Sequence, residues 1–128
     1  MTFNEEHALE TYKSLISFGT ESLKALQLLN GGAIVALLAY LGQTKIVPSV
    51  ANNIGCPLIF FIIGLSISMF TYFLAYFTQL SLFNETVNPT TFKGKPHTFW
   101  LTFAICCLIL SLIFFIAGAW FGVKALTA

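Results

Sequence analysis

The residues of this chain best able to do chemistry are polar side chains standing inside an apolar stretch. Hydroxyls and an amide follow one another there, at Ser66, Ser68, Thr71, Thr78 and Gln79. Groups of this kind need hydrogen-bond partners or water wherever bulk solvent is absent. None of them has a base or acid nearby in the sequence, so the row indicates helix contacts or a polar path rather than bond cleavage.

The titratable residues assemble into no recognisable catalytic or metal-binding pattern. His7 and His97 lie alone in polar segments, and the adjacent Cys106 and Cys107 point to different faces of a helix. Cys56 is too far away in sequence to complete a metal-ligand spacing with them. We therefore expect no enzyme activity, no catalytic residue, no metal site and no cofactor.

Composition places the chain among membrane proteins. It is 57% hydrophobic and only 9% charged, whereas soluble domains carry about 25% charged residues. It contains no Arg, so it lacks the bidentate phosphate clamp of nucleic-acid-binding proteins. We expect contact with membrane lipid and none with nucleic acid.

Three stretches without Asp, Glu, Lys or Arg set the expected architecture, namely residues 25–44, 57–82 and 98–123. The last two would each form a helix of about 39 Å, longer than the ~30 Å hydrocarbon core of a bilayer. Pro57 suits the first turn of the second span, after a connection at 45–55. The sequence predicts three spans joined by short polar connections.

Residues 1–24 form a separate, amphipathic unit that is expected to be cytoplasmic or interfacial. Apolar residues recur there every three or four positions, and charged residues fill the other side. Nothing breaks the helix before the first uncharged stretch. The expected fold is therefore an all-α membrane protein, in which an amphipathic N-terminal helix continues into the first of three transmembrane helices, with residues 25–128 as the transmembrane domain.

The distribution of Lys predicts which side of the membrane each terminus occupies. The N-terminal segment and the second connection lie on one side, while the first connection and the C-terminus lie on the other. Because Lys near a span stays in the cytoplasm, the larger number marks the inner side. The first pair holds Lys13, Lys24, Lys93 and Lys95, and the second holds Lys45 and Lys124. The N-terminus is therefore expected inside.

Small residues at helical spacing mark the faces of the spans that are expected to approach another helix. Two interpretations stay open: packing within one three-helix bundle, or a polar face lining a pore at the axis of a homo-oligomer. Large aromatic side chains nearby are candidates for an apolar gate that closes by excluding water. The candidate pore-lining or packing residues are Asn30, Gly32, Ala36, Gly64, Ser68, Thr71, Ala75 and Thr78, and the candidate gate is Phe70, Phe73 and Phe77.

Asn30 opens the run Leu-Asn-Gly-Gly-Ala near the start of the first span. Its amide either bonds to a neighbouring helix or forms a ring at a pore mouth. The segment at residues 29–42 resembles the first span of many small, uncharacterised bacterial inner-membrane proteins, in which such a run follows an amphipathic helix. The resemblance covers about the first third of the chain and implies a bacterial inner-membrane location. In size and build the chain also resembles membrane effectors of bacterial antiviral and toxin-like systems.

These observations leave three functional hypotheses. The first is a homo-oligomeric pore or channel-like protein of the bacterial inner membrane, acting as an effector in antiviral defence or a toxin-like system. The second is a small accessory or scaffold subunit that binds a protein partner through its N-terminal amphipathic helix. The third is a phage holin-like protein, although residues 123–128 carry one Lys where holins usually carry a strongly charged tail.

Overall fold

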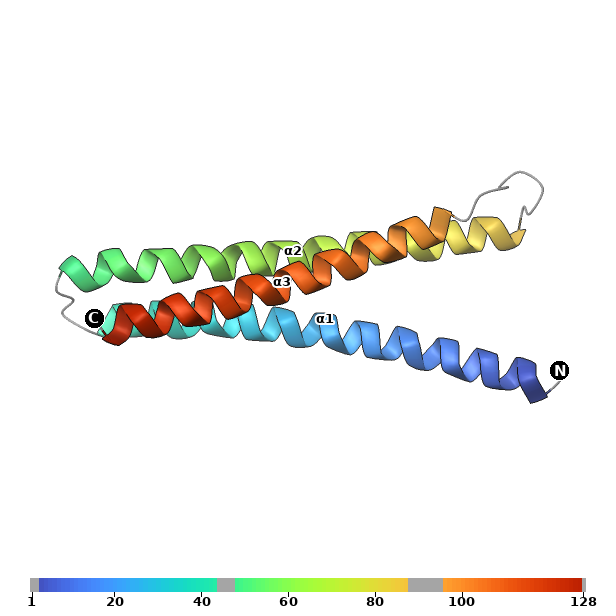
Figure 1. Ribbon diagram of the computed structural model, residues 1–128, viewed down its shortest axis with the longest axis horizontal. Helices are drawn as coiled ribbons and strands as arrows, with labels where there is room; N and C mark the ends of the chain where they lie inside the picture. Colours follow the sequence, from blue (N-terminus) through green and yellow to red (C-terminus); the bar gives the residue numbers. More distant parts are fainter. Residues whose placement is uncertain (1–2, 44–47, 88–95, 128) are drawn as a thin grey trace.

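The computed structural model describes residues 3–43, 48–87 and 96–127, and all of them are helical (Figure 1). Helix α1 runs over Phe3–Gln43, α2 over Pro48–Val87 and α3 over Pro96–Thr127. Consecutive helices are antiparallel, so the N-terminus lies at the same end of the molecule as the α2–α3 connection (Figure 1). The expected all-α architecture, with one unbroken helix from the N-terminal segment through the first span, is confirmed.

Each of the three helices is long and apolar enough to cross a membrane. At about 1.5 Å per residue, even α3 is about 48 Å long and exceeds the hydrocarbon core. The helices therefore continue beyond their uncharged stretches at one or both ends. The protein is a multi-pass membrane protein.

The second helix begins earlier than the sequence predicted. Residues 48–55, which we expected within a connection, are helical, and Pro57 is an interior helix residue rather than a first-turn one. The side chain of Pro57 is buried, and a Cβ at Gly122 of α3 would lie 3.7 Å from it. A proline is tolerated at such a place in a membrane helix because neighbouring groups compensate for the missing N–H.

A continuous seam joins α2 and α3, which form the most extensive helix pair of the fold. Small residues allow the two backbones to approach closely, as membrane helices require when lipid supplies no hydrophobic drive. At Gly118 the fit is tight, because a Cβ there would lie 2.9 Å from the ring of Phe61. Seven residues, at steps of three or four on α2 and of seven on α3, form the core of the seam: Phe61, Gly64, Ser68 and Thr71 on α2, and Ala104, Ser111 and Gly118 on α3.

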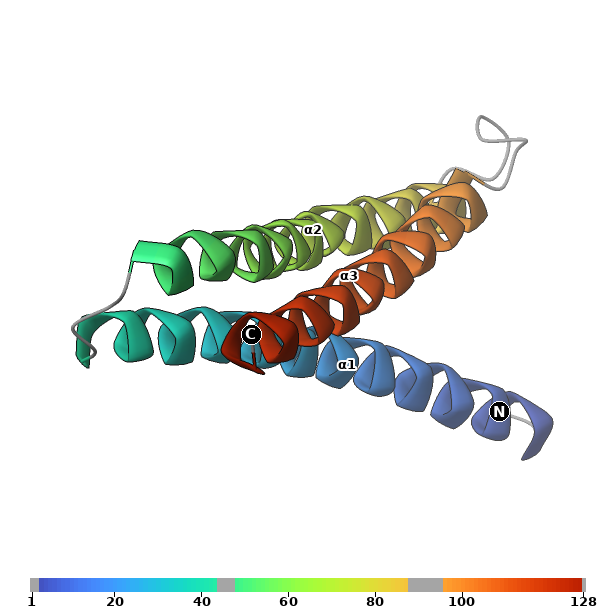
Figure 2. The same cartoon turned by 60° about the vertical axis from the view of Figure 1, so that its left-hand side comes forward.

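Helix α1 is attached differently. It contacts α2 more than α3, and its buried residues, Leu23, Leu26 and Asn30, lie in the middle of the helix. Toward its N-terminus α1 diverges from the α2–α3 pair, as both views show (Figures 1 and 2). The fold is thus a closed helix pair with a third helix joined to it near mid-length.

At the end where α1 diverges, one side chain fixes the start of α3. Both carboxylate oxygens of Glu85, near the end of α2, are used by His97. One accepts a hydrogen bond from the backbone N–H at 3.1 Å, and the other lies 2.6 Å from the ring Nδ1. Because the first N–H groups of a helix have no partner within the helix, Glu85 caps α3 and ties it to α2.

Candidate functional site

The three helices meet at a polar junction formed by Asn30 of α1, Gly64 of α2 and Ser111 of α3. All three residues are buried. The hydroxyl of Ser111 donates a hydrogen bond of 2.8 Å to the backbone carbonyl of Gly64. On the other side of Gly64, a Cβ would lie 2.5 Å from Asn30 Oδ1. A larger residue at position 64 would require the Asn30 side chain to move, so glycine allows α1 and α2 to approach closely here.

The amide of Asn30 is satisfied on one side only. Its Nδ2 donates to the carbonyl of Leu26, one turn earlier, at 3.0 Å. Its Oδ1 is buried and has no hydrogen-bond partner in the part of the chain that the structure describes. Because an added Cβ at Gly64 would point at this oxygen, the Cα–H of Gly64 takes that direction. A Cα–H···O contact is a weak but recurrent interaction between helices.

The hydroxyls along α2, which the sequence singled out as groups needing partners, are satisfied within their own helix. Ser68, Thr71 and Thr78 donate to backbone carbonyls three or four residues earlier, at 2.8–2.9 Å. All three side chains are buried in the seams of a single chain. Their position corresponds to the helix-packing interpretation.

The other candidate residues from the sequence lie at different places. Gly32 and Ala36 are exposed on α1, away from its buried side, and Ala75 is half-buried. The three candidate gate residues are also exposed, at 42–64% of their surface, on the outside of the bundle. One of them stacks on Trp100 of α3 with ring centroids 5.3 Å apart. These candidate gate residues are Phe70, Phe73 and Phe77.

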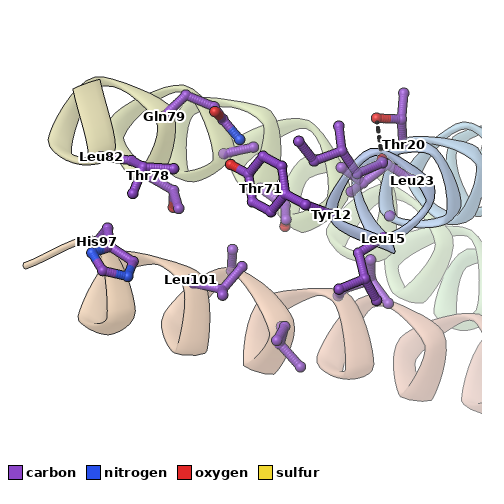
Figure 3. Close-up of a pocket in the computed structure, with 16 residues that line it drawn as sticks. Tyr12, Leu15, Thr20, Leu23, Thr71, Thr78, Gln79, Leu82, His97 and Leu101 are labelled. Atoms are coloured by element: carbon purple, nitrogen blue, oxygen red, sulfur yellow. Dashed lines mark hydrogen bonds between the residues drawn. The ribbon is translucent and has the colours of Figure 1, made fainter. Parts of the chain in front are cut away.

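Where α1 diverges, a groove of about 380 Å³ opens between all three helices (Figure 3). It extends along α2 from Thr71 to Leu82 and along α1 from Tyr12 to Leu23. The third wall is α3, from His97 to Leu108. Most lining side chains are aliphatic, and the threonine hydroxyls of the wall are already bonded to their own helices.

The polar groups of the groove gather at the end away from the junction. Gln79 of α2 and His97 of α3 lie on opposite walls there (Figure 3), and Tyr12 lines the groove from α1. The His97 ring is held by Glu85, as described above. Within the described residues, the phenol of Tyr12 and the amide of Gln79 have no hydrogen-bond partner. The groove thus has an apolar body and a polar mouth.

The face of α1 that points away from the bundle has a pattern of its own. Its members are spaced by three, four or seven residues, and all are exposed. In its first half it is charged, and in its second half it is aliphatic. We call this face the outer stripe, and it consists of Glu10, Lys13, Ser17, Glu21, Lys24, Leu28 and Val35.

The inner end of the charged half of the outer stripe, Glu21 and Lys24, lies level with an apolar part of α2. Two contacts set the register: Asn30 against Gly64, and Gln27 Nε2 at 3.0 Å from Met69 Sδ. Counting from them in antiparallel helices places Glu21 and Lys24 beside residues 70–75, about 8–15 Å from residue 65, the middle of the uncharged run 46–84. An exposed ion pair of α1 therefore lies beside an uncharged part of α2.

Glu21 and Lys24 pair with each other at 3.1 Å, but α2 and α3 do not cover them. Their side chains are 66% and 60% exposed, respectively. A charge at the centre of a bilayer costs about 2.5–3.5 kcal/mol on insertion scales, and such residues face protein or water rather than lipid. Tilting α1 does not bring these charges to the membrane surface, because each residue of a tilted helix rises by less than about 1.5 Å along the membrane normal.

Two features of this region were missed by sequence reasoning. The first is the hydrogen bond of Ser111 to Gly64, which depends on the register of two helices distant in sequence. The outer stripe could have been found, because its three-and-four spacing continues from the charged segment into the first span. Treating residues 1–24 and 25–44 as separate units concealed that continuity.

The described residues contain no group of three or more His, Cys, Asp or Glu side chains that could hold a metal ion. No known protein family, curated protein or solved structure matches this chain.

Proposed function

We propose that this protein assembles with copies of itself into a pore or channel of the bacterial inner membrane, with the outer stripe of α1 facing a water-filled path. The bacterial location is supported by the resemblance of the first span, and the cytoplasmic N-terminus by the excess of Lys on that side. A role as an effector in antiviral defence or a toxin-like system is supported by the similar size and build of such effectors.

The single observation that carries the proposal is the depth of the exposed Glu21–Lys24 pair. It lies beside residues 70–75 of α2, inside the uncharged run of that helix, and the chain itself does not cover it. Water or another protein must therefore meet this face. In a ring of copies whose outer stripes face a common axis, this face meets both water in the path and the neighbouring subunit.

The spacing of the charges suits such a ring. Glu21 and Lys24 differ in height by about 4.5 Å, so the carboxylate of one subunit can pair with the ammonium of the next. Glu10 and Lys13 repeat the same arrangement nearer the N-terminus. Carboxylates and ammonium groups then alternate around the path, and their charges balance.

The aliphatic half of the stripe gives the path a gate. Leu28 is 77% exposed and Val35 is 66% exposed, and both follow the charged residues along the same face. Rings of aliphatic side chains close a narrow pore by excluding water. This proposal moves the gate from the phenylalanines of α2, which face outward from the bundle, to α1.

The proposal is tested by ion flux from vesicles of phosphatidylethanolamine and phosphatidylglycerol that hold the protein at matched density, together with its mass in detergent. The wild type is expected to be oligomeric and to conduct. Replacing both Glu21 and Lys24 with Leu should abolish flux, whereas Phe73→Leu on the outside of α2 should leave it unchanged.

If the wild type is monomeric and gives no flux, the pore proposal fails. The accessory-subunit hypothesis then takes its place, with the outer stripe as the surface that a partner protein covers. A partner of that kind would co-purify with the wild type and be lost in the Leu double variant.

A further inference from the structure

We infer that the groove between α1, α2 and α3 binds one acyl chain of a membrane phospholipid, whose polar end lies at Tyr12 and Gln79. The inference concerns a different face of α1 from the outer stripe. It stands or falls independently of the proposed pore.

The depth and length of the groove match one leaflet of a bilayer. Along α2 it extends from Leu82, near the end of the uncharged run, inward to Thr71. That distance is about 16 Å, against about 15 Å for half of a ~30 Å hydrocarbon core. A lipid of that leaflet can therefore place its chain in the groove while its headgroup stays at the membrane surface.

The chemistry of the walls suits a hydrocarbon chain. Leu15, Leu23, Leu101 and Leu108 are among the lining residues. The hydroxyl of Thr71 in the wall donates to the carbonyl of Ile67 at 2.9 Å, so it does not need a hydrogen-bond acceptor from a ligand. An occupant with polar groups along its length would bury them without partners, which is costly. An acyl chain buries none.

The mouth of the groove supplies donors for the ester and phosphate oxygens of a phospholipid. A phenol and a carboxamide each carry at least one N–H or O–H group, and those of Tyr12 and Gln79 have no acceptor within the described residues. Glu85 and His97 already bind each other across α2 and α3. The neutral donors are thus left to contact the lipid.

The inner end of the groove is closed, which distinguishes this site from the general lipid surface of the bundle. Beyond Leu23, Thr71 and Leu108 come the buried side chains of Asn30, Ser68 and Ser111. A chain entering from the mouth therefore stops at the polar junction. It contacts three helices, whereas a lipid on the outside of a helix pair contacts at most two.

The experiment counts phospholipids retained by the protein. The full chain is reconstituted in vesicles of phosphatidylethanolamine and phosphatidylglycerol, extracted in a mild detergent and weighed by native mass spectrometry. The wild type is expected to retain one phospholipid per chain. Ala75→Trp, which fills the groove from α2, should lower the retained fraction several-fold, and Leu101→Trp should do the same from α3.

Two controls separate a bound lipid from a damaged protein. Ala36→Trp makes the same change at an exposed site outside the groove and should retain lipid like the wild type. Gln79→Leu keeps the groove open but removes the donor, and it should lower retention less than the Trp variants do. Far-ultraviolet circular dichroism checks that each variant stays helical.

A wild type without retained phospholipid would overturn the inference, and so would retention in both folded Trp variants equal to that of Ala36→Trp. Either result would leave ion flux through a pore untouched, because the count is made in detergent and needs no conduction. Retained lipid in a protein that gives no ion flux would support lipid binding in the groove and contradict the proposed pore.

Discussion

Helices α2 and α3 pack closely and their polar side chains along the seam are hydrogen-bonded, whereas α1 carries charged side chains that the rest of the chain does not cover. Along the α2–α3 seam, small residues face large ones, and the polar side chains there are hydrogen-bonded. On α1, by contrast, a charged pair at membrane depth is open to the surroundings. A Cβ added at Gly31 or Gly32 would meet nothing within 4 Å. The α2–α3 helix pair is the structural scaffold, and α1 carries the face left open to water or to another protein.

The glycines make the contrast measurable. A glycine inside a helix costs about 1 kcal/mol relative to alanine, so it needs a reason. At Gly64 and Gly118 the reason is visible, because a neighbouring side chain occupies the place of the Cβ. At Gly32 no atom of the same chain lies near the place of the Cβ, so packing within the chain does not explain this glycine.

The largest expected effect on stability comes from exchanging the two kinds of glycine for alanine. Gly64→Ala drives a methyl group into the Asn30 amide and should destabilise the fold by about 1–3 kcal/mol. The matched change Gly32→Ala meets nothing and should be neutral or stabilise α1 by up to about 1 kcal/mol. Thermal unfolding in detergent compares them. Equal losses at both sites would erase the difference between the seam and the outside of α1.

A smaller loss is expected when the bond between α3 and α2 is removed. Ser111→Ala deletes the hydroxyl that reaches the Gly64 carbonyl, and hydrogen bonds between membrane helices average about 0.6 kcal/mol. The same unfolding assay applies, with Ser66→Ala on the exposed side of α2 as control. A loss as small as that of the control would show that close packing alone holds the seam.

The smallest effect is expected at Asn30, although it is fully buried. Its Oδ1 has no partner among the described residues, and its Nδ2 bonds within α1. Because removing an unsatisfied polar group together with its local bond is nearly neutral, Asn30→Ala should change stability by less than about 0.5 kcal/mol. A much larger loss in unfolding experiments would mean that Oδ1 has a partner in the membrane, such as water or a second chain.

The sequence predicted the architecture well, because uncharged stretches and helical spacing are local signals. Residues 3–43 form one helix as expected, and the small-residue faces of α2 and α3 do meet. The early start of α2 was missed, since Pro48 and Pro57 both suit a helix start and the sequence favoured the later one.

The site was harder to predict, because it depends on register between helices. Counting along the chain cannot show that Lys24 lies beside the middle of α2, or that Ser111 reaches Gly64. The small residues Gly32 and Ala36 share a spacing with those of α2, yet the structure leaves them exposed. The spacing of small residues identifies a helix face, but which helix packs against that face depends on the three-dimensional arrangement of the helices.

The most direct test of the central claim asks whether the outer stripe meets water at the depth of the membrane. Lys24 is replaced with Cys after the three native cysteines have been changed to Ala, and vesicles holding the protein are treated with a charged, membrane-impermeant thiol reagent. We predict that Cys at position 24 reacts, while Cys in place of Phe70, exposed on α2 at the same level, does not. Protection at both positions would contradict the account, because the outer stripe of α1 would then lie against lipid or be sealed by protein.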